Sequence, residues 1–354
     1  MGLPFLNNRA RKRDQIISID LGGNSTKAVA LQRKGDRFSL TDYAVVDSPK
    51  QDKPMSSSEL TEHLKQVMQN LDTRQRQVTL CLGVNESVFR QTEVPFVPVA
   101  DLRQMLKYNA KNYLQQDYPD HVFDCHYLLT AGGDSSPKPA SGPVKHKVVV
   151  GGARRQSVEN IAEAIKGAGL IPDQLVPGLI GPVNAFELSE PEAFANEVFA
   201  LVDMGFRNTS IVILAKGQIL LNRVVAIGGD HLTAGLADTL NISYQEAENI
   251  KVGMPTEVQQ NLEPLLQPLG RELRASIDFF EHQQDKAVAK VYVSGGPARS
   301  EFLFEALQAE LLVPCQAWSP TKTLNLGLKP QKLVELEQIA PQLAVAIGAA
   351  AVSF

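Results

Sequence analysis

A single stretch of sequence decides the fold: Ile16-Ile17-Ser18-Ile19-Asp20-Leu21-Gly22-Gly23-Asn24-Ser25-Thr26-Lys27-Ala28-Val29-Ala30-Leu31. An apolar run ends in one carboxylate, passes through small and polar residues, and resumes as alternating apolar sequence. This pattern predicts a strand, a tight turn and a second strand. No helix pattern follows the glycines, so the stretch differs from the Walker and dinucleotide-binding turns, which hold phosphate at a helix N-terminus.

The turn of this stretch has the residues for a phosphate site of another kind. Gly22 and Gly23 let successive backbone N–H groups approach a phosphate closely, and Asp20 at the strand end is placed to face a hydrated Mg²⁺. The same turn chemistry is also typical of a plain structural turn. A second observation is therefore needed to choose between the two interpretations.

A second copy of the motif lies about half a chain further on. Residues 202–214 align with residues 19–31 without a gap, so that Asp203 matches Asp20 at an offset of 183 residues. Each copy continues through another turn into a third apolar strand, which predicts two three-stranded meanders. Two similar lobes would place both acid-headed turns across one cleft, around a single polyphosphate.

The composition limits the class of protein. The 354 residues are 44% hydrophobic and 21% charged, which is typical of an ordinary globular protein of about two domains. The formal net charge of −4 argues against nucleic acid as the main partner, since there is no broad basic excess. The cysteines are scattered without metal-ligand spacing, and His121, Cys125 and His126 lack a second cluster, so we expect a reducing cytoplasm and no metal at these residues.

The ends of the chain predict neither a signal peptide nor a membrane span. Apolar residues precede the basic ones in residues 3–13, the reverse of a signal peptide. The longest apolar run, residues 343–352, is well short of the roughly twenty residues that cross a bilayer. We expect residues 1–14 to form a solvated basic tail, with contact to an anionic membrane surface as the alternative.

Residues 84–169, between the two repeats, predict a compact unit of their own. The pattern gives strands at 88–94, 123–130 and 144–150, an exposed loop at 131–143, a helix capped by Asp101 and Gln104, and a helix from Ser157. We interpret this unit as an insertion that interrupts the first lobe. The predicted division is a first lobe at 15–83 and 170–190, the insertion at 84–169, a second lobe at 191–339 and a closing helix at 340–354.

Two further features follow the second meander. Ser243 and Glu246 form a capping box for a helix that carries Glu248 and Lys251 on one face, and the plain interpretation of that pair is a surface ion pair. A buried strand over residues 291–295 then meets the pair Gly295-Gly296, which lets a flat or charged ligand group lie against bare backbone.

The order of these motifs resembles that of the actin and sugar-kinase superfamily, and within its FtsA and PilM branch the likeness is to the PilM family of type IV pilus assembly proteins. Residues 20–46, 203–229, 243–248 and 340–348 carry the likeness over nearly the whole chain. It implies an α/β, two-lobed actin-like (ribonuclease H-like) fold with an inserted FtsA/PilM-type subdomain. It further implies ATP and Mg²⁺ as cofactors.

The resemblance also implies a cytoplasmic scaffold, peripheral at the inner face of the cytoplasmic membrane. Such a scaffold would hold the N-terminal tail of a PilN-like inner-membrane protein between the first lobe and the insertion. Membrane contact would then be mainly indirect, through that partner, and weak self-association is compatible with it. Two alternatives remain: an FtsA-like filament-forming scaffold, and a small-molecule kinase of the same superfamily.

The site residues implied by the resemblance fall on both turns. The phosphates would be contacted by Gly22, Gly23, Asn24, Ser25, Lys27, Gly205, Asn208 and Thr209. Asp20 and Asp203 would hold Mg²⁺ through water, Glu248 and Lys251 would reach ribose and base, and Gly295 and Gly296 would lie against the adenosine.

The same resemblance argues against rapid catalysis. Phe206 and Arg207 stand where rapidly hydrolysing relatives prefer glycines. The connecting segment 176–183 has no Glu, Gln or Asp to orient an attacking water, and positioning is most of the chemistry in phosphoryl transfer. We therefore expect ATP hydrolysis to be slow or absent, and no catalytic residue is predicted.

Overall fold

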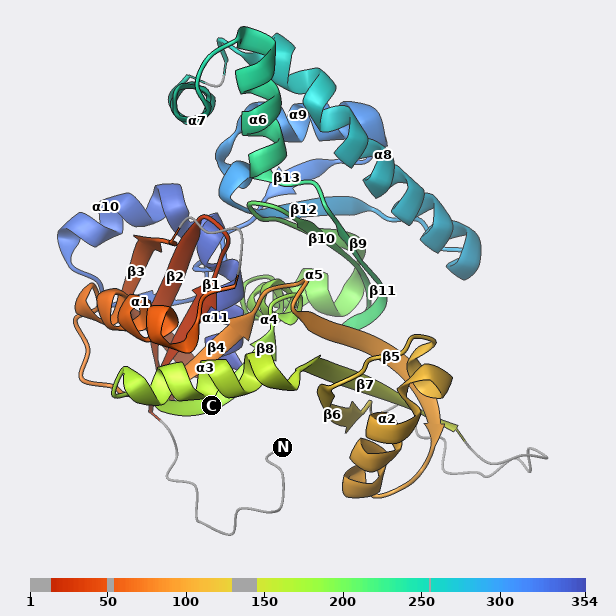
Figure 1. Cartoon of the computed structure of the whole chain (residues 1–354). Coiled ribbons are helices and arrows are strands. Elements are labelled where there is room, and N and C mark those ends of the chain that lie inside the picture. The colour runs from red at the N-terminus through yellow and green to blue at the C-terminus, as the bar shows by residue number, and fades with distance from the viewer. Residues whose placement is uncertain (1–13, 50–53, 129–144, 255) are drawn as a thin grey trace.

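The structure, a computed structural model, describes residues 14–49, 54–128, 145–254 and 256–354. Nearly all of the expected basic tail and the whole expected loop at 131–143 lie outside the described residues. The described chain forms a six-stranded sheet, a five-stranded sheet and a three-stranded sheet, with helices packed against them (Figure 1).

The six-stranded sheet is built on the first predicted meander and defines the first lobe. Strands β1 (Gln15–Leu21), β2 (Ser25–Lys34) and β3 (Arg37–Asp47) are consecutive and antiparallel. β4 (Gln77–Leu82) and β8 (Ile171–Pro177) add in parallel beside β1, and β14 (Asn325–Leu326) pairs with β3. The predicted strand, turn and strand are thereby confirmed.

One face of this sheet is covered by α1 (Ser57–Gln69) and α3 (Arg155–Gly167) (Figure 1). The helix α1 begins at a capping box, in which Ser56 and Glu59 exchange hydrogen bonds. Leu64 of α1 and Ile165 of α3 share one core with the sheet. The helix α3 was predicted as part of the insertion and to start at Ser157, but it starts at Arg155 and its apolar face packs in the first lobe.

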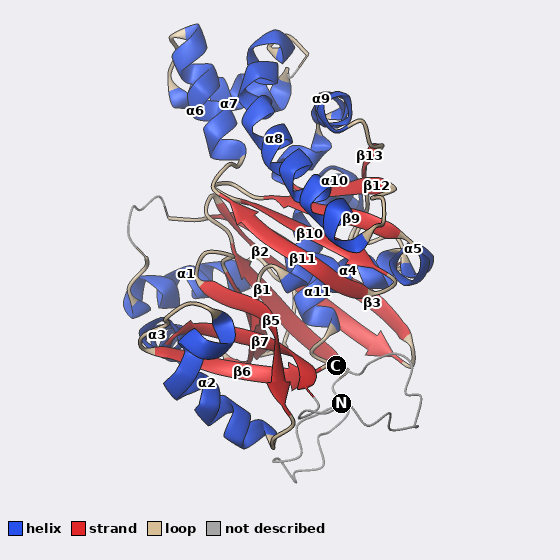
Figure 2. Ribbon diagram, turned by 90° about the vertical axis from the view of Figure 1, so that its right-hand side faces the viewer, coloured by secondary structure: helices blue, strands red, loops and turns tan. Residues whose placement is uncertain are grey.

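The second lobe repeats the arrangement, as predicted from the repeat. β9 (Val198–Met204), β10 (Thr209–Ala215) and β11 (Gln218–Val225) form the second meander, β12 (Lys290–Gly295) lies parallel to β9, and β13 (Cys315–Ala317) ends the sheet. Its helices are α6 (Gly229–Leu240), α7 (Tyr244–Gly253), α8 (Gln259–Gln284) and α9 (Glu301–Leu311). Figure 2 shows these helices at the top of the view, above the strands of this sheet.

The two lobes share an apolar core that contains α4 (Ile180–Ser189) and α11 (Ala344–Ala351), and the short helix α5 (Pro191–Asn196) follows α4. The helices α4 and α11 approach so closely that a Cβ added at Gly348 would lie 1.8 Å from the carbonyl oxygen of Gly181. Among the described residues, one run, Pro330–Ala351, is long and apolar enough by composition to cross a membrane. Half of its apolar window is buried inside the protein, where α11 forms part of this core.

The three-stranded sheet and one helix form the inserted unit. β5 (Ser87–Pro95) and β6 (His121–Tyr127) flank β7 (Lys145–Arg154), and α2 (Val99–Leu114) packs on them through a separate small core. The predicted cap of α2 by Asp101 is wrong, because the helix begins earlier, with Pro98 at its N-cap and no side-chain capping bond. Asp101 instead lies in the first helical turn.

The chain returns to the first lobe before its closing helix. In α10 (Pro330–Ile339), Lys332 Nζ lies 2.6 Å from Asp42 Oδ1, and Tyr43 Oη donates to the carbonyl of Lys332 at 2.8 Å. Together with β14, this segment lies on the edge of the first sheet (Figure 1). Residues 325–339 therefore pack against the first lobe. The prediction from sequence that they belong to the second lobe is wrong.

Candidate functional site: the cleft between two repeated turns

The two acid-headed turns face each other at the mouth of the cleft between the lobes. We call residues 20–27 the first turn and residues 203–210 the second turn. A Cβ added at Gly23 would lie 3.3 Å from the ring of Phe206, so the tips of the turns are in contact. The charge of Asp20 also raises the pKa of Asp203, as expected for carboxyl groups on facing turns.

Both carboxyl groups are held in a weakly solvated place. Burial raises the pKa of Asp203 to about 6, and a hydrogen bond from Ser294 Oγ to Asp203 Oδ1, 2.7 Å long, acts in the opposite direction. Burial likewise raises the pKa of Asp20, and the neighbouring Lys27 opposes this rise. Two partly buried acids beside one lysine make a place where a further cation is favourable.

This donor set fits a hydrated Mg²⁺. The described residues contain no group of three or more acidic, histidine or cysteine side chains that could enclose a metal. Mg²⁺ commonly keeps several waters and uses one or two carboxylates together with the phosphates of a nucleotide. Asp20 and Asp203 supply those two carboxylates, and their predicted role as water-mediated ligands stays a prediction.

The first turn presents unpaired donors at its tip. Ser48 holds two carbonyl groups of this turn in place by hydrogen bonds: Ser48 Oγ donates to Gly22 O at 2.7 Å, and Ser48 N donates to Asn24 O at 3.0 Å. Within the described part of the chain, the N–H groups of Gly23 and Asn24 have no acceptor. The ammonium of Lys27 lies 2.7 Å from the position of a Cβ added at Gly22. Donors and one cation therefore gather where phosphate oxygens were predicted, and Ser25 begins β2 beside them.

The second turn is braced by the helix that follows its meander. Gly205 N donates to Asn208 O at 2.9 Å, which closes the turn. At the start of α6, Gly229 N donates to Gly205 O at 3.0 Å and Asp230 N donates to Phe206 O at 2.8 Å. The helix N-terminus thus supports the turn, and Thr209 at the start of β10 fixes the other side by donating to Ile227 O at 2.6 Å.

The glycine pair after β12 lies beside the second turn. Gly295 has a φ of +95°, and a Cβ there would lie 2.1 Å from Met204 O, so no other residue fits without strain. Gly296 has open space around it. A Cβ added at Gly229 would lie 3.6 Å from Pro297 and 3.9 Å from Lys251 Nζ, so this loop, α6 and α7 meet at one corner of the cleft.

Glu248 and Lys251 of α7 form the ion pair that the sequence suggested. Lys251 Nζ lies 2.6 Å from Glu248 Oε2, and it also donates to Thr233 Oγ1 at 2.5 Å and to Gly229 O at 3.2 Å. Their charges are therefore already partnered across α6 and α7. Contact with ribose and base stays a prediction.

Several residues that build this site were not predicted. Ser294 stands directly before Gly295-Gly296 at the end of a buried strand, so its position was a usable signal. The hydrogen bonds of Ser48, Thr233 and Asn85 depend on tertiary contacts, and no local pattern marks them.

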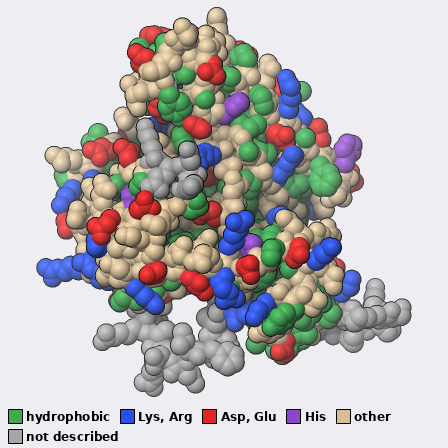
Figure 3. Space-filling view, viewed as in Figure 1, with side chains coloured by type: hydrophobic (Ala, Val, Ile, Leu, Met, Phe, Trp, Pro, Cys, Tyr) green, Lys and Arg blue, Asp and Glu red, His purple; other side chains and the backbone are tan. Residues whose placement is uncertain are grey.

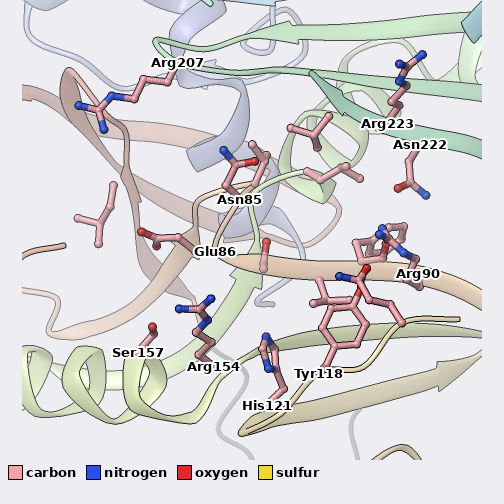
Figure 4. Close-up of a pocket in the computed structure, with 18 of the residues that line it drawn as sticks. Asn85, Glu86, Arg90, Tyr118, His121, Arg154, Ser157, Arg207, Asn222 and Arg223 are labelled. Atoms are coloured by element: carbon pink, nitrogen blue, oxygen red, sulfur yellow. Dashed lines mark hydrogen bonds between the residues drawn. The ribbon is translucent and has the colours of Figure 1, made fainter. Parts of the chain in front are cut away.

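A second feature, a large hollow, adjoins the cleft (Figure 4). Its cavity volume is about 1850 Å³, and Gly22, Gly23 and Arg207 of the two turns lie at its border. Its walls come from the first lobe, the insertion, the start of α3, β11 and α8, and apolar and polar side chains alternate around them. In Figure 3, Lys and Arg side chains gather around the junction above the inserted unit.

Two lobes of repeated topology whose acid-headed turns meet over one cleft define an actin-like α/β protein. Solved structures agree with this class. The PilM-PilN type IV pilus biogenesis complex aligns over 96% of this chain and 98% of the other, with a TM-score of 0.81 and 24% identity. MreB5 of Spiroplasma citri bound to AMPPNP aligns over 95% of each chain, with a TM-score of 0.52 and 10% identity.

The sequence comparison identifies the family. Residues 18–354 match the family described as "Type IV pilus assembly protein PilM", and the chain belongs to that family. The cell division protein FtsA of Bacillus subtilis (strain 168) is 21% identical over 257 residues, which are 66% of this chain and 57% of FtsA. The chain spans about half the length of the curated relatives it matches. The expected fold and family are thus confirmed.

Proposed function

We propose that this protein is an ATP-binding scaffold of a type IV pilus-like assembly platform at the cytoplasmic face of the inner membrane. It would hold the N-terminal tail of a PilN-like membrane protein. The observation that carries the proposal is the meeting of the two turns, with Asp20 and Asp203 in one weakly solvated place. The likeness to MreB5 bound to AMPPNP and to the PilM-PilN complex supports it.

In this proposal the nucleotide closes the lobes. The free N–H groups of Gly23 and Asn24 and the ammonium of Lys27 would bind the phosphates from the first lobe, and Asn208 would bind them from the second. Mg²⁺ would supply charge neutralisation between the carboxylates and the phosphates. Since the ligand touches both lobes and the unfolded chain offers no such site, binding stabilises the closed form by mass action.

The hollow beside the cleft is the proposed docking site. Its first-lobe wall is apolar, formed by Leu21, Met55, Leu60 and Ile161. Its polar wall includes Glu86, Arg154 and Ser157, which Figure 4 shows around the opening. A hollow that combines an apolar first-lobe wall with many polar side chains suits a short extended segment that buries apolar side chains and pairs a carboxylate or carbonyl with Arg154.

We propose that the nucleotide is a structural ligand and is not rapidly hydrolysed. Phe206 occupies the tip of the second turn, and the carbonyls of Gly205 and Phe206 accept hydrogen bonds from α6. The second turn therefore has a fixed backbone, but the connecting segment 176–183 has no Glu, Gln or Asp to orient an attacking water. We expect hydrolysis at a rate far below that of active ATPases of the same fold.

The proposal is tested by calorimetry with MgATP and by capture of the partner. Wild-type protein should bind MgATP, and Asp203→Asn should lose most of the Mg²⁺ dependence of that binding. A full-length PilN-like protein should be retained, whereas a version without its cytoplasmic tail should not. ATP-dependent filaments in light scattering, or phosphorylation of a sugar, would instead support the two alternatives.

A matched pair of variants locates the docking site. Met55→Asp places a charge on the apolar floor of the hollow and should abolish tail-dependent capture. Val334→Asp places the same charge on α10, where the side chain is 74% exposed and lies away from the hollow, and should leave capture unchanged. Equal loss in both variants, or in neither, would contradict this site.

A further inference from the structure

A hydrogen bond between two asparagines joins the nucleotide cleft to the hollow. Asn85 Nδ2 donates to Asn208 Oδ1 at 2.9 Å, although the residues are 123 positions apart. Asn85 lies in the connection from β4 of the first lobe to β5 of the insertion, and Asn208 lies in the second turn. Among the described residues, it is the one hydrogen bond that joins residues 205–209 to a residue outside the second lobe. We call it the asparagine bridge.

The chemistry of the amide gives the bridge a direction. A carboxamide has an acceptor oxygen and an NH₂ group with two donors. Asn85 occupies the oxygen of Asn208, and the Asn208 NH₂ group has no acceptor among the described residues. The oxygens of a phosphate act only as acceptors. The bridge therefore leaves the donor group of Asn208, its NH₂, for the phosphate. The reverse orientation would present an oxygen to the phosphate.

The other end of the bridge borders the hollow. Asn85 stands in a compact turn in which Glu86 N donates to Gly83 O at 2.9 Å and Ser87 Oγ donates to Gly83 O at 3.1 Å. Val84, Asn85 and Glu86 all line the hollow. Figure 4 shows Asn85 and Glu86 between Arg207 of the second turn and Arg154 at the start of α3. A segment bound in the hollow would therefore contact the turn that orients Asn208.

We propose that Asn85 is a positioning residue that orients Asn208 toward the nucleotide phosphates and makes nucleotide binding respond to occupancy of the hollow. This inference rests on the proposed function. Occupancy of the hollow holds the turn around Asn85, and an oriented Asn208 then binds phosphate without first giving up conformational freedom. Linkage requires that the nucleotide strengthen tail binding by the same factor.

The test is a double-mutant cycle on the affinity for MgATP, measured by calorimetry. Asn85→Ala and Asn208→Ala should each weaken binding about tenfold, and the double variant should be no weaker than either single variant, because both remove one interaction. Asn85→Asp should weaken binding more than Asn85→Ala does. The aspartate accepts from the Asn208 NH₂ group and so removes the donor from the phosphate.

The control is Asn112, which is exposed on α2 of the insertion and does not line the hollow. Asn112→Ala and Asn112→Asp remove the same amide and add the same charge, and the affinity should stay within about twofold of wild type, as for additive changes at an uncoupled site. Thermal unfolding of every variant verifies the fold.

A second measurement reads the coupling. A synthetic peptide with the N-terminal cytoplasmic residues of the PilN-like protein from the same genome, at saturation, should tighten MgATP binding about fivefold or more in wild type, and not in Asn85→Ala. If wild type binds MgATP, either of two results overturns this inference alone. One is an affinity of Asn85→Ala equal to that of wild type, and the other is that the losses of affinity in Asn85→Ala and Asn208→Ala add in the double variant. An equal effect of the peptide on both proteins also overturns it. Wild type that does not bind MgATP overturns the proposed function as well.

Discussion

The first and second turns hold their carboxylates with different neighbours at equivalent positions. In the first lobe, Asp20 lies opposite Lys27 of β2 on one side and Cys81 of β4 on the other. In the second lobe, Asp203 occupies the same place between Ser210 of β10 and Ser294 of β12. The backbone repeats, whereas a cation stands beside the first acid and a hydroxyl donates to the second.

This difference shows how one cleft divides its chemistry between two similar lobes. Lys27 lies opposite Asp20 in the β1–β2 pair, and its charge lowers the pKa of Asp20 and of Asp203. Ser294 acts on Asp203 alone by a direct hydrogen bond. The first turn therefore supplies charge, and the second supplies a fixed carboxylate. Each of the following predictions changes one side of this comparison.

The largest effect is expected at the residue that follows Ser294. In the first lobe Leu82 follows Cys81, but in the second lobe only glycine fits, since a Cβ at Gly295 would lie 2.1 Å from Met204 O at a φ of +95°. Gly295→Ala should lower the free energy of unfolding by about 3 kcal/mol or more. The measurement is chemical denaturation. Gly296→Ala, with open space around it, is the control and should change stability by less than about 1 kcal/mol.

The second effect concerns the cation. Lys27→Ser gives the first turn the residue type of the equivalent position in the second turn, Ser210. It should weaken MgATP binding about thirtyfold, because a charge-assisted contact to phosphate is lost. Lys34→Ser, at the far exposed end of the same strand, is the matched control for calorimetry. Equal affinities of Lys27→Ser and wild type would mean that Lys27 only balances the two acids.

The third prediction is a dependence of stability on pH. The pKa of Asp203 is raised from 3.8 to about 6, so between these values the native state holds a proton that the unfolded chain has released. The free energy of unfolding of the ligand-free protein should therefore fall as pH rises from about 4 to 6, by about 1–2 kcal/mol.

The control for this pH effect is Asp203→Asn, which does not titrate. Its free energy of unfolding should fall less over the same range, and the difference between the two profiles is the contribution of Asp203. Asp20, whose pKa is also raised by burial, acts in the same direction in both proteins. Parallel profiles for wild type and Asp203→Asn would show that Asp203 ionises normally.

The smallest effect is expected for Ser294→Cys, which copies the first lobe into the second. The hydrogen bond to Asp203 is lost, and the remaining burial should raise the pKa of Asp203 further. Stability near neutral pH should fall by about 1 kcal/mol, and the pH-dependent range should move upward. A titration of Asp203 by NMR measures the shift, and an unchanged midpoint would contradict the role given to Ser294.

Sequence reasoning succeeded where local pattern and repetition determine structure. The two meanders followed from apolar alternation and from the gapless match of Asp203 to Asp20. The predicted capping box at Ser243 starts a helix in the structure because both reciprocal bonds form locally. The meeting of the two turns was predicted from the repeat itself.

The failures share a different cause. The helix from Arg155 joins the first lobe through its apolar face, and residues 325–339 return to the first sheet through Lys332 and Asp42, which are far apart in sequence. The asparagine bridge likewise depends on two loops that meet only in the folded chain. A helix pattern predicts which face is apolar, but not which of two nearby cores will receive it.

The crossing of α4 and α11 has a mechanical consequence for all of these contacts. Where a Cβ at Gly348 would touch the Gly181 carbonyl, backbone rests on backbone without side chains that can change rotamer. Rotation of one half of the molecule against the other would pivot at such a rigid fulcrum. Displacement grows with distance from the fulcrum, so a rotation of a few degrees moves the outer parts of the lobes most. Cys81, the β4 neighbour of Asp20, moves least, because its Sγ lies 3.9 Å from the carbonyl oxygen of Val345 in α11.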